Sequence, residues 1–228
     1  SSIEKYARIK GLGLVGTGDF THPVWVKEIG KDLRDDGNGI FLNETGFPFL
    51  LTSEISLVYT QDGKGYRVHV VLLAPDLSCV KKITDYLLTK GRIDYDGRPI
   101  FKIPCAEFVE QMMSIDKRIE VIPAHVWTPW FSLFGSKSGY DLIDTCFGDQ
   151  IKNIHALETG ISSDPAMNYR LSQLDRFYFV SFSDSHSFWP WRMGREATRF
   201  ELKELSYENL IGALRTGNGL AGTIETSP

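Results

Sequence analysis

The chain alternates short apolar segments, typical of strands, with segments of helical periodicity, and this alternation limits the folds that it can adopt. The predicted strands cover residues 12–17, 49–59, 67–74, 120–124, 154–157, 177–182 and 219–224. The predicted helices cover residues 3–10, 23–34, 77–90, 104–115, 165–174 and 208–216. This pattern predicts βα units with mostly parallel strands. Because no repeat, low-complexity tract or linker interrupts it, we expect one domain over residues 1–228.

Two of the predicted strands, 49–59 and 67–74, are expected to form a hairpin. The sequence QDGKG between them is a strong turn signal. Both strands carry a polar residue inside an apolar run, Glu54 in the first and His69 in the second. A carboxylate buried there without a partner is costly. Glu54 could therefore pair with Arg67 or His69 across the hairpin, or it could bind a metal ion.

Polar side chains also follow the predicted strands directly, at Asp19, His125, Glu158, Asp184 and His186. In a closed α/β barrel the carboxyl ends of all strands meet at one rim, where catalytic residues collect. In an open sheet, ligands bind mainly at one switch point, and residues from nearly every strand would be harder to gather there. The placement of these residues therefore favours an irregular α/β barrel.

Histidine and carboxylate side chains that converge in this way suit zinc, manganese or iron. Several such ligands together indicate more than one ion, as in phosphoester hydrolysis, where metal ions bind the attacking and leaving oxygens. Structural alternatives remain for each residue. Asp19 could be a turn residue, Glu158 a helix cap, and Asp184 with His186 a cap or a core pair. His69 could be a core histidine, and we interpret His155, at the start of its strand, as structural.

Composition excludes some classes of protein. The chain has 228 residues, is 42% hydrophobic and 24% charged, and contains no apolar run close to the roughly 20 residues that span a bilayer. Its net charge of −4 argues against a surface coated with basic residues for nucleic acid, but it does not exclude a local basic groove. The three widely spaced cysteines predict reduced thiols in a cytoplasmic protein without membrane contact.

A series of motifs occurs in order: GLVGTGDFTHP, LLTSEIS, RVHVVLLAP, VIPAHVWTPWFSLFGSKSG, ALETGISSDP and FVSFSDSHSFWPWRMGRE. The series resembles the PHP (polymerase and histidinol phosphatase) superfamily, and more closely the PHP domain of the endonuclease Q family of DNA repair enzymes. The resemblance implies a distorted seven-stranded (β/α) TIM-like barrel. It also implies up to three divalent metal ions (Zn, Mn, Mg or Fe) at the carboxyl ends of the strands.

The same resemblance implies a role for individual residues. Glu54 matches a carboxylate that bridges two metals, and Asp184 matches a ligand of the first metal. The other implied metal ligands are His69 and His125 on the second metal and His22 and His186 on the third. Catalysis would depend on Asp184, Glu54 and His125. Asp19 and Glu158 lie in the matching motifs and are expected to orient the ligands.

The chain departs from the family pattern at both ends. The superfamily begins with a strand that carries His-x-His, and this strand would lie before Ser1. A cysteine-rich C-terminal region of the endonuclease Q family is also not part of the sequence. We therefore expect a fragment of a longer protein, with the first barrel strand missing and with first and third metal sites that depend on the missing ligands.

The resemblance implies cleavage of the DNA backbone on the 5′ side of a deaminated base or abasic site, with deoxyuridine, deoxyinosine or xanthine as lesions. Reading a damaged base requires its extrusion into a pocket of aromatic and polar groups. Aromatic candidates for base contacts are Trp127, Trp130, Phe131, Trp189 and Trp191, and basic candidates for phosphate contacts are Lys137, Arg192 and Arg195. These aromatic residues could instead cap the barrel core, and the arginines could form surface salt bridges.

Three functions are compatible with the sequence. The first is a metal-dependent DNA repair endonuclease with damaged DNA as its partner. The second is a small-molecule phosphoesterase of the same superfamily, similar to histidinol phosphatase. The third is a non-catalytic DNA-binding module whose metal sites are structural or lost.

Overall fold

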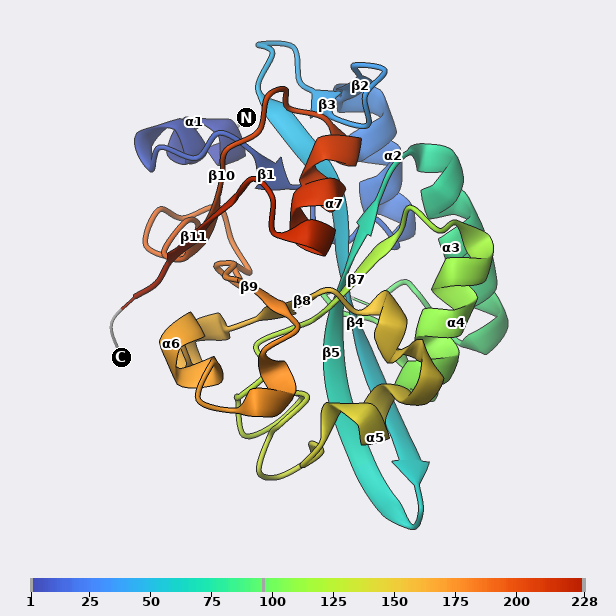
Figure 1. Ribbon diagram of the computed structural model, residues 1–228. Coiled ribbons are helices and arrows are strands. Elements are labelled where there is room, and N and C mark those ends of the chain that lie inside the picture. The colour runs from blue at the N-terminus through green and yellow to red at the C-terminus, as the bar shows by residue number, and fades with distance from the viewer. Residues whose placement is uncertain (1, 96, 227–228) are drawn as a thin grey trace.

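A long two-stranded hairpin runs through the structure, which is a computed structural model that describes residues 2–95 and 97–226 (Figure 1). Its strands are β4 (Pro48–Gln61) and β5 (Lys64–Ala74), which pair antiparallel over the full length of β5. Asp62 and Gly63 connect them with φ angles of 52° and 77°. Left-handed conformations at both central residues are typical of tight hairpin turns that match the strand twist. The expected hairpin is therefore confirmed.

The other strands of the largest sheet are added around this hairpin. They are β1 (Val15–Gly16), β2 (Arg34–Asp35), β3 (Phe41–Leu42), β6 (Ile100–Phe101) and β7 (Glu120–Pro123). The sheet order is β2-β3-β4-β5-β7, and every neighbouring pair on this path is antiparallel. Only β1 and β6 pair with β4 in parallel. The expectation of mostly parallel strands is wrong for this sheet, because a two-residue turn between β4 and β5 requires antiparallel pairing.

Four strands form two smaller sheets. β8 (Ala156–Glu158) and β9 (Tyr178–Val180) pair in parallel, and β10 (Ala197–Phe200) and β11 (Leu220–Ile224) pair antiparallel. Val126 donates a backbone hydrogen bond of 3.0 Å to the carbonyl of Glu158, which holds the segment after β7 beside β8. The described residues thus form a mixed α/β fold without a closed sheet, and the expected seven-stranded barrel is not confirmed.

Helices lie on both sides of the central hairpin. The α-helices are α1 (Ser2–Ile9), α2 (Pro23–Asp32), α3 (Leu77–Lys90), α4 (Cys105–Ile115), α5 (Ile143–Phe147), α6 (Pro165–Asn168) and α7 (Tyr207–Thr216). The 3-10 helices are η1 (Gly148–Asn153), η2 (Gly160–Ser162) and η3 (Ser172–Leu174). Figure 1 shows α3 and α4 together on one side, with α7 on the other side of β7. Each described helix is too short or too polar to cross a membrane.

The alternation of β5 explains how a histidine comes to lie beside a hydrophobic core. Val68, Val70 and Leu72 belong to the larger core cluster, and Leu73 belongs to a smaller cluster with residues of α7. Successive side chains of a strand point to opposite faces. His69 therefore shares the face of Leu73, away from the larger core.

Some predicted elements differ from those observed. The predicted helix 165–174 divides into α6 and η3, and Asn168, the last residue of α6, donates a side-chain hydrogen bond of 2.8 Å to the carbonyl of Asp164. Such local bonds compete with a regular helix. The two-residue strands β2, β3 and β6 were not predicted, since two residues show no alternation of polar and apolar side chains.

The N-terminal helix α1 is attached to the rest of the structure through the carboxylate of Glu4. This carboxylate accepts hydrogen bonds from Thr45 Oγ1 at 2.7 Å, Arg8 Nε at 2.8 Å and Asn43 Nδ2 at 2.8 Å. These bonds lower the pKa of Glu4 to about 2. The ionised carboxylate therefore connects α1 to the turn between β3 and β4.

Candidate metal centre

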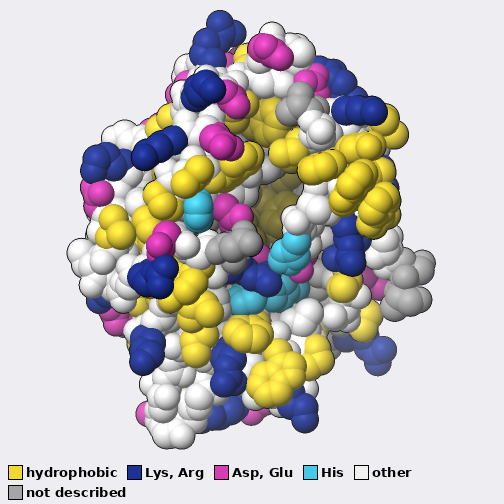
Figure 2. Space-filling view, turned by 180° about the vertical axis from the view of Figure 1, so that it is seen from behind, with side chains coloured by type: hydrophobic (Ala, Val, Ile, Leu, Met, Phe, Trp, Pro, Cys, Tyr) yellow, Lys and Arg dark blue, Asp and Glu magenta, His cyan; other side chains and the backbone are white. Residues whose placement is uncertain are grey.

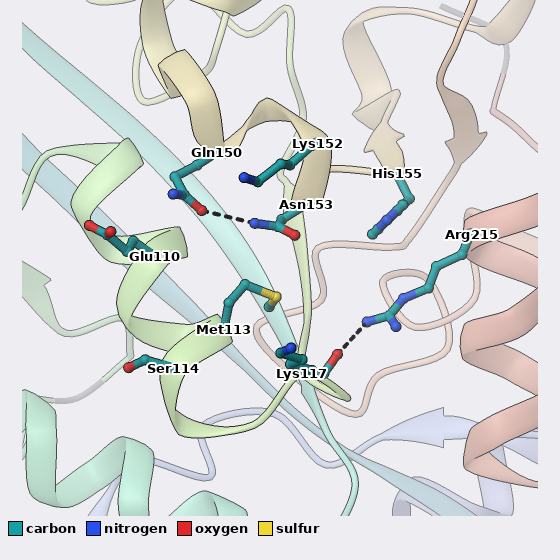
Figure 3. Close-up of a pocket in the computed structure, with 9 residues that line it drawn as sticks. All are labelled: Glu110, Met113, Ser114, Lys117, Gln150, Lys152, Asn153, His155 and Arg215. Atoms are coloured by element: carbon teal, nitrogen blue, oxygen red, sulfur yellow. Dashed lines mark hydrogen bonds between the residues drawn. The ribbon is translucent and has the colours of Figure 1, made fainter.

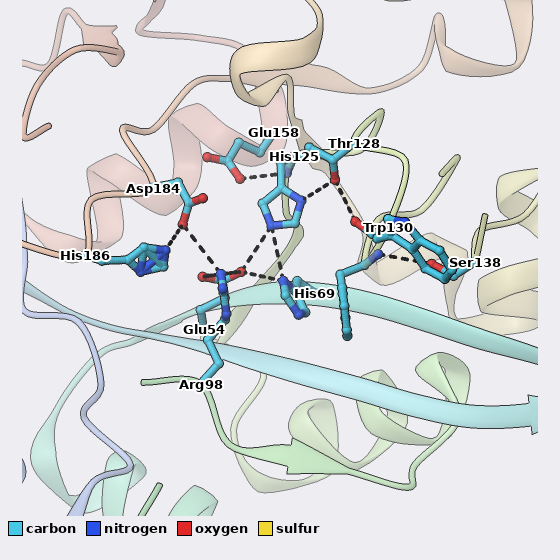
Figure 4. Close-up of polar contacts among 11 residues, drawn as sticks. Glu54, His69, Arg98, His125, Thr128, Trp130, Ser138, Glu158, Asp184 and His186 are labelled. Atoms are coloured by element: carbon cyan, nitrogen blue, oxygen red, sulfur yellow. Dashed lines mark hydrogen bonds and ion pairs between the residues drawn. The ribbon is translucent and has the colours of Figure 1, made fainter. Parts of the chain in front are cut away.

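Three ligand-type side chains from separate elements meet at one point. Glu54 comes from β4, His69 from β5, and His125 from the segment directly after β7 (Figure 4). Opposite residues pair as Glu54 with Val71 and Ser56 with His69, so Glu54 and His69 are diagonal neighbours on one face of the hairpin. Figure 2 shows histidine side chains around a hollow on one face of the molecule, with acidic side chains between them.

The spacing of these groups, which we call the donor triangle, fits a divalent metal ion. Glu54 Oε1 lies 3.1 Å from His69 Nδ1 and 3.3 Å from His125 Nε2, and the two nitrogens are 3.2 Å apart. Ligand atoms of a tetrahedral zinc ion with bonds of about 2.0–2.2 Å lie about 3.3–3.6 Å apart. Two histidines and one carboxylate are also a donor set of catalytic zinc sites, in which a fourth position stays open to water or substrate.

Hydrogen bonds fix the ring of His125 in the orientation that a ligand needs. The hydroxyl oxygen of Thr128 has two carbonyl oxygens within hydrogen-bond distance, that of His125 at 3.2 Å and that of Trp130 at 2.9 Å. The same hydroxyl oxygen lies 3.1 Å from the ring nitrogen Nδ1 of His125. The single hydroxyl hydrogen is donated to a carbonyl, so the hydroxyl accepts from Nδ1–H. In the neutral ring this leaves the lone pair on Nε2, the nitrogen that faces Glu54 and His69; when the ring is protonated, Nε2–H donates to Glu54 Oε1 at 3.3 Å. The backbone N–H of His125 donates to Glu158 Oε2 at 2.8 Å.

Three of the residues that follow strands have an uncommon backbone conformation. Asp19 (φ 43°), His125 (φ 32°) and Asp184 (φ 44°) are left-handed, after β1, β7 and β9 respectively. Non-glycine residues in this region cost conformational energy and are concentrated at functional sites. Next to His125, Gly160 packs so closely that a Cβ atom added to it would lie 2.5 Å from the Cβ of His125.

An arginine that the sequence analysis did not identify lies between two of the predicted ligands. Nη1 of Arg98 is 3.1 and 3.0 Å from the two carboxylate oxygens of Glu54 and 3.6 Å from Asp184 Oδ1. The parallel pairing of Ser56 with Ile100 brings Arg98 beside Glu54. No local signal marks this residue, because its position results from the pairing of the two-residue strand β6 with β4.

The remaining predicted ligands lie at different distances from the donor triangle. His186 Nε2 is 3.4 Å from Asp184 Oδ1, so His186 is linked to Glu54 only through Asp184 and Arg98. The side chain of His186 is 64% exposed, whereas that of His69 is 7% exposed, so the cluster opens toward solvent on the Asp184 side. His22 Nδ1 accepts from the backbone of Val24 at 3.3 Å and caps α2.

The electrostatics of the cluster favour a bound cation. Burial opposes the charge of Glu54, but hydrogen bonds from His125 and His69 outweigh it and hold the pKa of Glu54 below its usual range. Burial raises the pKa of Glu158 to about 8 despite the attraction of His125, and the charges of Glu54 and Asp184 contribute to this rise. Burial and then the charge of Glu54 raise the pKa of Asp19. A metal ion would relieve this excess of negative charge.

Further contacts define the surroundings of His125 and His69. Burial alone would lower the pKa of His125, but its hydrogen bond with Glu54 and the nearby carboxylates raise it. Burial lowers the pKa of His69 against the attraction of Glu54. The ring of Phe131 stacks on His69 with centroids 4.8 Å apart. Arg67, one of the expected partners of Glu54, instead lies 5.5 Å from the ring centroid of Trp130.

The candidate DNA contacts after His125 fall into two groups. Trp127 is half-buried, donates from Nε1 to Asn168 Oδ1 at 2.7 Å and stacks on Phe134. Trp130 is 50% exposed, and Lys137 is exposed in the same loop. Trp130 and Lys137 thus present their side chains to solvent, and their role in binding DNA remains a prediction.

The candidates after His186 lie in one ordered loop. Trp189 and Trp191 stack on each other with centroids 5.1 Å apart, and both are exposed. Arg195 donates from Nε to the carbonyl of Ser183 at 2.9 Å, which ties the loop to the strand end. Arg192 is exposed. These contacts do not test the predicted phosphate contacts of the two arginines.

A separate pocket of about 520 Å³ is shown in Figure 3. On its wall, His155 Nδ1 and Arg215 Nε are each 2.8 Å from the carboxylate of the fully buried Glu120. Glu120 begins β7 and His125 follows its end, so this pocket and the donor triangle lie at opposite ends of the strand. His155 therefore has a structural partner, consistent with its interpretation from the sequence.

Comparisons with known proteins relate this geometry to an enzyme family. No protein-family model matches the chain. The uncharacterized protein YqxK of Bacillus subtilis is 28% identical over 218 residues, which are 90% of this chain and 52% of YqxK. The lesion-specific endonuclease PfuEndoQ from Pyrococcus furiosus has a TM-score of 0.83 and 34% identity, over 96% of this chain and 51% of PfuEndoQ. The chain is a structural relative of endonuclease Q.

A second endonuclease Q structure, in complex with a 27-mer duplex substrate with an abasic lesion at the active site, gives a TM-score of 0.83 and 33% identity. These matches confirm the resemblance inferred from the motifs. A proposed metal-dependent phosphoesterase from Bifidobacterium adolescentis has a TM-score of 0.53 at 14% identity, which shows a shared fold alone. The chain spans about half the length of YqxK and of the endonuclease Q structures.

Proposed function

We propose that this chain is the metal-dependent catalytic part of a DNA repair endonuclease that cleaves the phosphodiester on the 5′ side of a deaminated base or an abasic site. The observation that carries the proposal is the donor triangle of Glu54, His69 and His125, which is spaced for a metal ion and open on the side of Asp184. The likeness to a lesion-specific endonuclease supports phosphodiester cleavage as the reaction.

The residues of this chain would divide the work as follows. Glu54, His69 and His125 would hold a metal ion, and Asp184 and His186 would extend the site toward solvent. Bound divalent ions would supply Lewis-acid chemistry, including activation of water at neutral pH. Glu158 and Thr128 would hold His125 in its ligand orientation. His22 and Asp19 are proposed to complete the outer part of the site.

Arg98 has a proposed role in binding the scissile phosphate. The side chain of Arg98 is 28% exposed, and its Nη1 lies between Glu54 and Asp184. Arginine recognises phosphate through paired hydrogen bonds. With Glu54 and Asp184 serving as ligands of bound metal ions, the guanidinium of Arg98 would be available to a phosphate oxygen.

Damaged DNA is proposed as the substrate on two grounds. An endonuclease Q structure contains a duplex with an abasic lesion at the active site. In this chain, the long loops that follow His125 and His186 carry exposed aromatic side chains, including Trp130, whose carbonyl accepts from the Thr128 hydroxyl that also contacts His125. Aromatic groups can receive a base extruded from the duplex. Deoxyuridine, deoxyinosine, xanthine and abasic sites are the proposed lesions.

The test is cleavage of matched duplexes, with and without one lesion, in the presence of Zn²⁺, Mn²⁺ or Mg²⁺. We expect a nick 5′ of the lesion. Asp184→Ala should abolish the nick and leave DNA binding largely intact, whereas the control Asp149→Ala changes an exposed carboxylate elsewhere and should cleave normally. Turnover of small phosphate esters without any nick would favour a small-molecule phosphoesterase. DNA binding without turnover of either substrate would favour a non-catalytic module.

A further inference from the structure

Four aromatic rings form a continuous row of contacts on the surface, and three of them lie in the loop that carries Asp184 and His186. Tyr6 of α1 stacks on Phe188 with centroids 6.2 Å apart and an interplanar angle of 8°. Phe188 lies 5.0 Å from Trp189, and Trp189 stacks on Trp191 at 5.1 Å and 7°. We call Tyr6, Phe188, Trp189 and Trp191 the aromatic ladder. It joins two segments that are far apart in the sequence.

The aromatic ladder is exposed although it is firmly held. Phe188, Trp189 and Trp191 are 39%, 43% and 65% exposed. The carbonyl of Trp189 accepts hydrogen bonds from the backbone N–H groups of Arg192 and Met193, and the side chain of Met193 is buried. Large aromatic side chains gathered on a surface in this way are typical of binding sites. The rings are therefore positioned for a ligand and do not serve only the core.

The ladder is continuous with the proposed catalytic site. Asp184, His186 and three of the four rings belong to one loop after β9. Trp189 is five positions after Asp184 in the chain, a reach of at most roughly 18 Å. Stacked nucleotides rise by about 3.4 Å along one strand. A DNA strand cleaved at the metal centre would therefore meet the ladder within about five nucleotides.

The charge around the ladder suits a polyanion. Lys5 Nζ lies 5.5 Å from the ring centroid of Tyr6, and Arg192 follows Trp191 directly. Over residues 2–95 and 97–226, no carboxylate forms an ion pair with Lys5 or Arg192. The ladder thus combines exposed rings with a cation at each end, and stacking rings together with basic groups are the means by which proteins bind single-stranded nucleic acid.

We propose that the aromatic ladder binds unpaired bases of the DNA strand next to the cleavage position, with Trp191 as the outermost stacking surface and Lys5 and Arg192 on the phosphates. This inference rests on the proposed function, because it takes the substrate of the metal centre to be DNA. It adds that this DNA is held as a single strand beside the lesion. Each stacked base contributes about 1–3 kcal/mol to binding.

The test is the affinity of the protein for a labelled single-stranded oligonucleotide and for the matched duplex, by fluorescence anisotropy in EDTA. Trp191→Ala should weaken single-strand binding by about 5- to 150-fold, the equivalent of one stacked base. Trp191→Phe, which keeps a flat ring, should retain most of the affinity. Tyr169→Ala, which removes a 51% exposed ring outside the ladder, is the matched control and should bind normally.

A second measurement separates this inference from the proposed function. Hydrolysis of bis(4-nitrophenyl) phosphate with Mn²⁺ needs the metal centre but no base stacking, so Trp191→Ala should retain it and Glu54→Ala should lose it. Unchanged single-strand affinity in Trp191→Ala would overturn the inference and leave the ladder as a surface for another protein. Equal loss of hydrolysis in both variants would also overturn it, because the ladder would then only support the fold of the site.

Discussion

Gly160 offers a direct test of the geometry around His125. This glycine is buried and left-handed, with φ +62°, and an added Cβ would lie 2.5 Å from the Cβ and 2.8 Å from the Cα of His125. Carbon atoms in contact normally lie about 3.5–4.0 Å apart. Gly160→Ala should therefore displace His125 by about 1 Å. The variant should also lose about 1–2 kcal/mol of stability, because alanine is unfavourable in the left-handed conformation.

A displacement of this size exceeds what a metal site tolerates. Ligand distances in such sites hold to within about 0.2 Å. Changes to groups that only support a ligand typically cost about 10- to 100-fold in metal affinity. Because Gly160→Ala moves His125, which is itself a proposed ligand, we expect metal affinity to fall by at least this factor, which equals about 1.4–2.8 kcal/mol.

The assay compares two glycine variants by titration calorimetry with Zn²⁺ or Mn²⁺ and by thermal unfolding with and without metal. Gly46→Ala is the matched control, because Gly46 is exposed, has φ +78° and has no atom within 4 Å of an added Cβ. Both variants carry the left-handed strain, but only Gly160→Ala should lose metal affinity. If Gly160→Ala bound metal as tightly as Gly46→Ala, the assignment of His125 as a ligand would be refuted.

Three other variants test the charges of the structure. Glu54→Gln keeps the shape of the side chain and removes its charge. Loss of a group that only supports a ligand costs about 10- to 100-fold in metal affinity, and calorimetry should show a larger loss for Glu54→Gln. Arg98→Ala leaves Glu54 and Asp184 without their shared cation, so the melting temperature of the metal-free protein should fall. Added metal should then raise the melting temperature of Arg98→Ala by more than that of the unaltered protein. An equal rise in the two proteins would contradict the proposed role of Arg98. The pKa of Glu4 is lowered from 4.5 to about 2, so its stabilising effect is complete above pH 4.5 and is lost as the pH falls toward 2. Glu4→Gln should therefore lower the melting temperature at pH 6 more than at pH 2.5, and an equal effect at both pH values would exclude this role.

The sequence predicted those parts of the site that depend on local pattern. Glu54 and His69 interrupt apolar strands that flank a strong turn, so a shared face on one hairpin could be expected before the structure was known. His125 and Asp184 were identified because each follows an apolar strand. Their roles as specific metal ligands came from the resemblance, and the structure brings only His125 into direct contact with Glu54 and His69.

What could not be predicted depends on tertiary contacts between short segments. Arg98 reaches Glu54 only because residues 100–101 pair with β4, and two residues are too few for a sequence pattern. The antiparallel path of the sheet was missed because alternating helices and strands suggested crossover connections. Tyr6 reads as an ordinary helix residue, and only the fold places it on Phe188 at the end of the aromatic ladder.

The backbone conformations at the strand ends support a functional origin for this site. Left-handed positions favour glycine, which the chain uses at positions such as Gly46 and Gly160. Asp19, His125 and Asp184 instead carry side chains there at an energetic cost. The histidine at position 125 is held by hydrogen bonds at its backbone and at its ring, which agrees with the proposed role of its Nε2 as a metal ligand of the donor triangle.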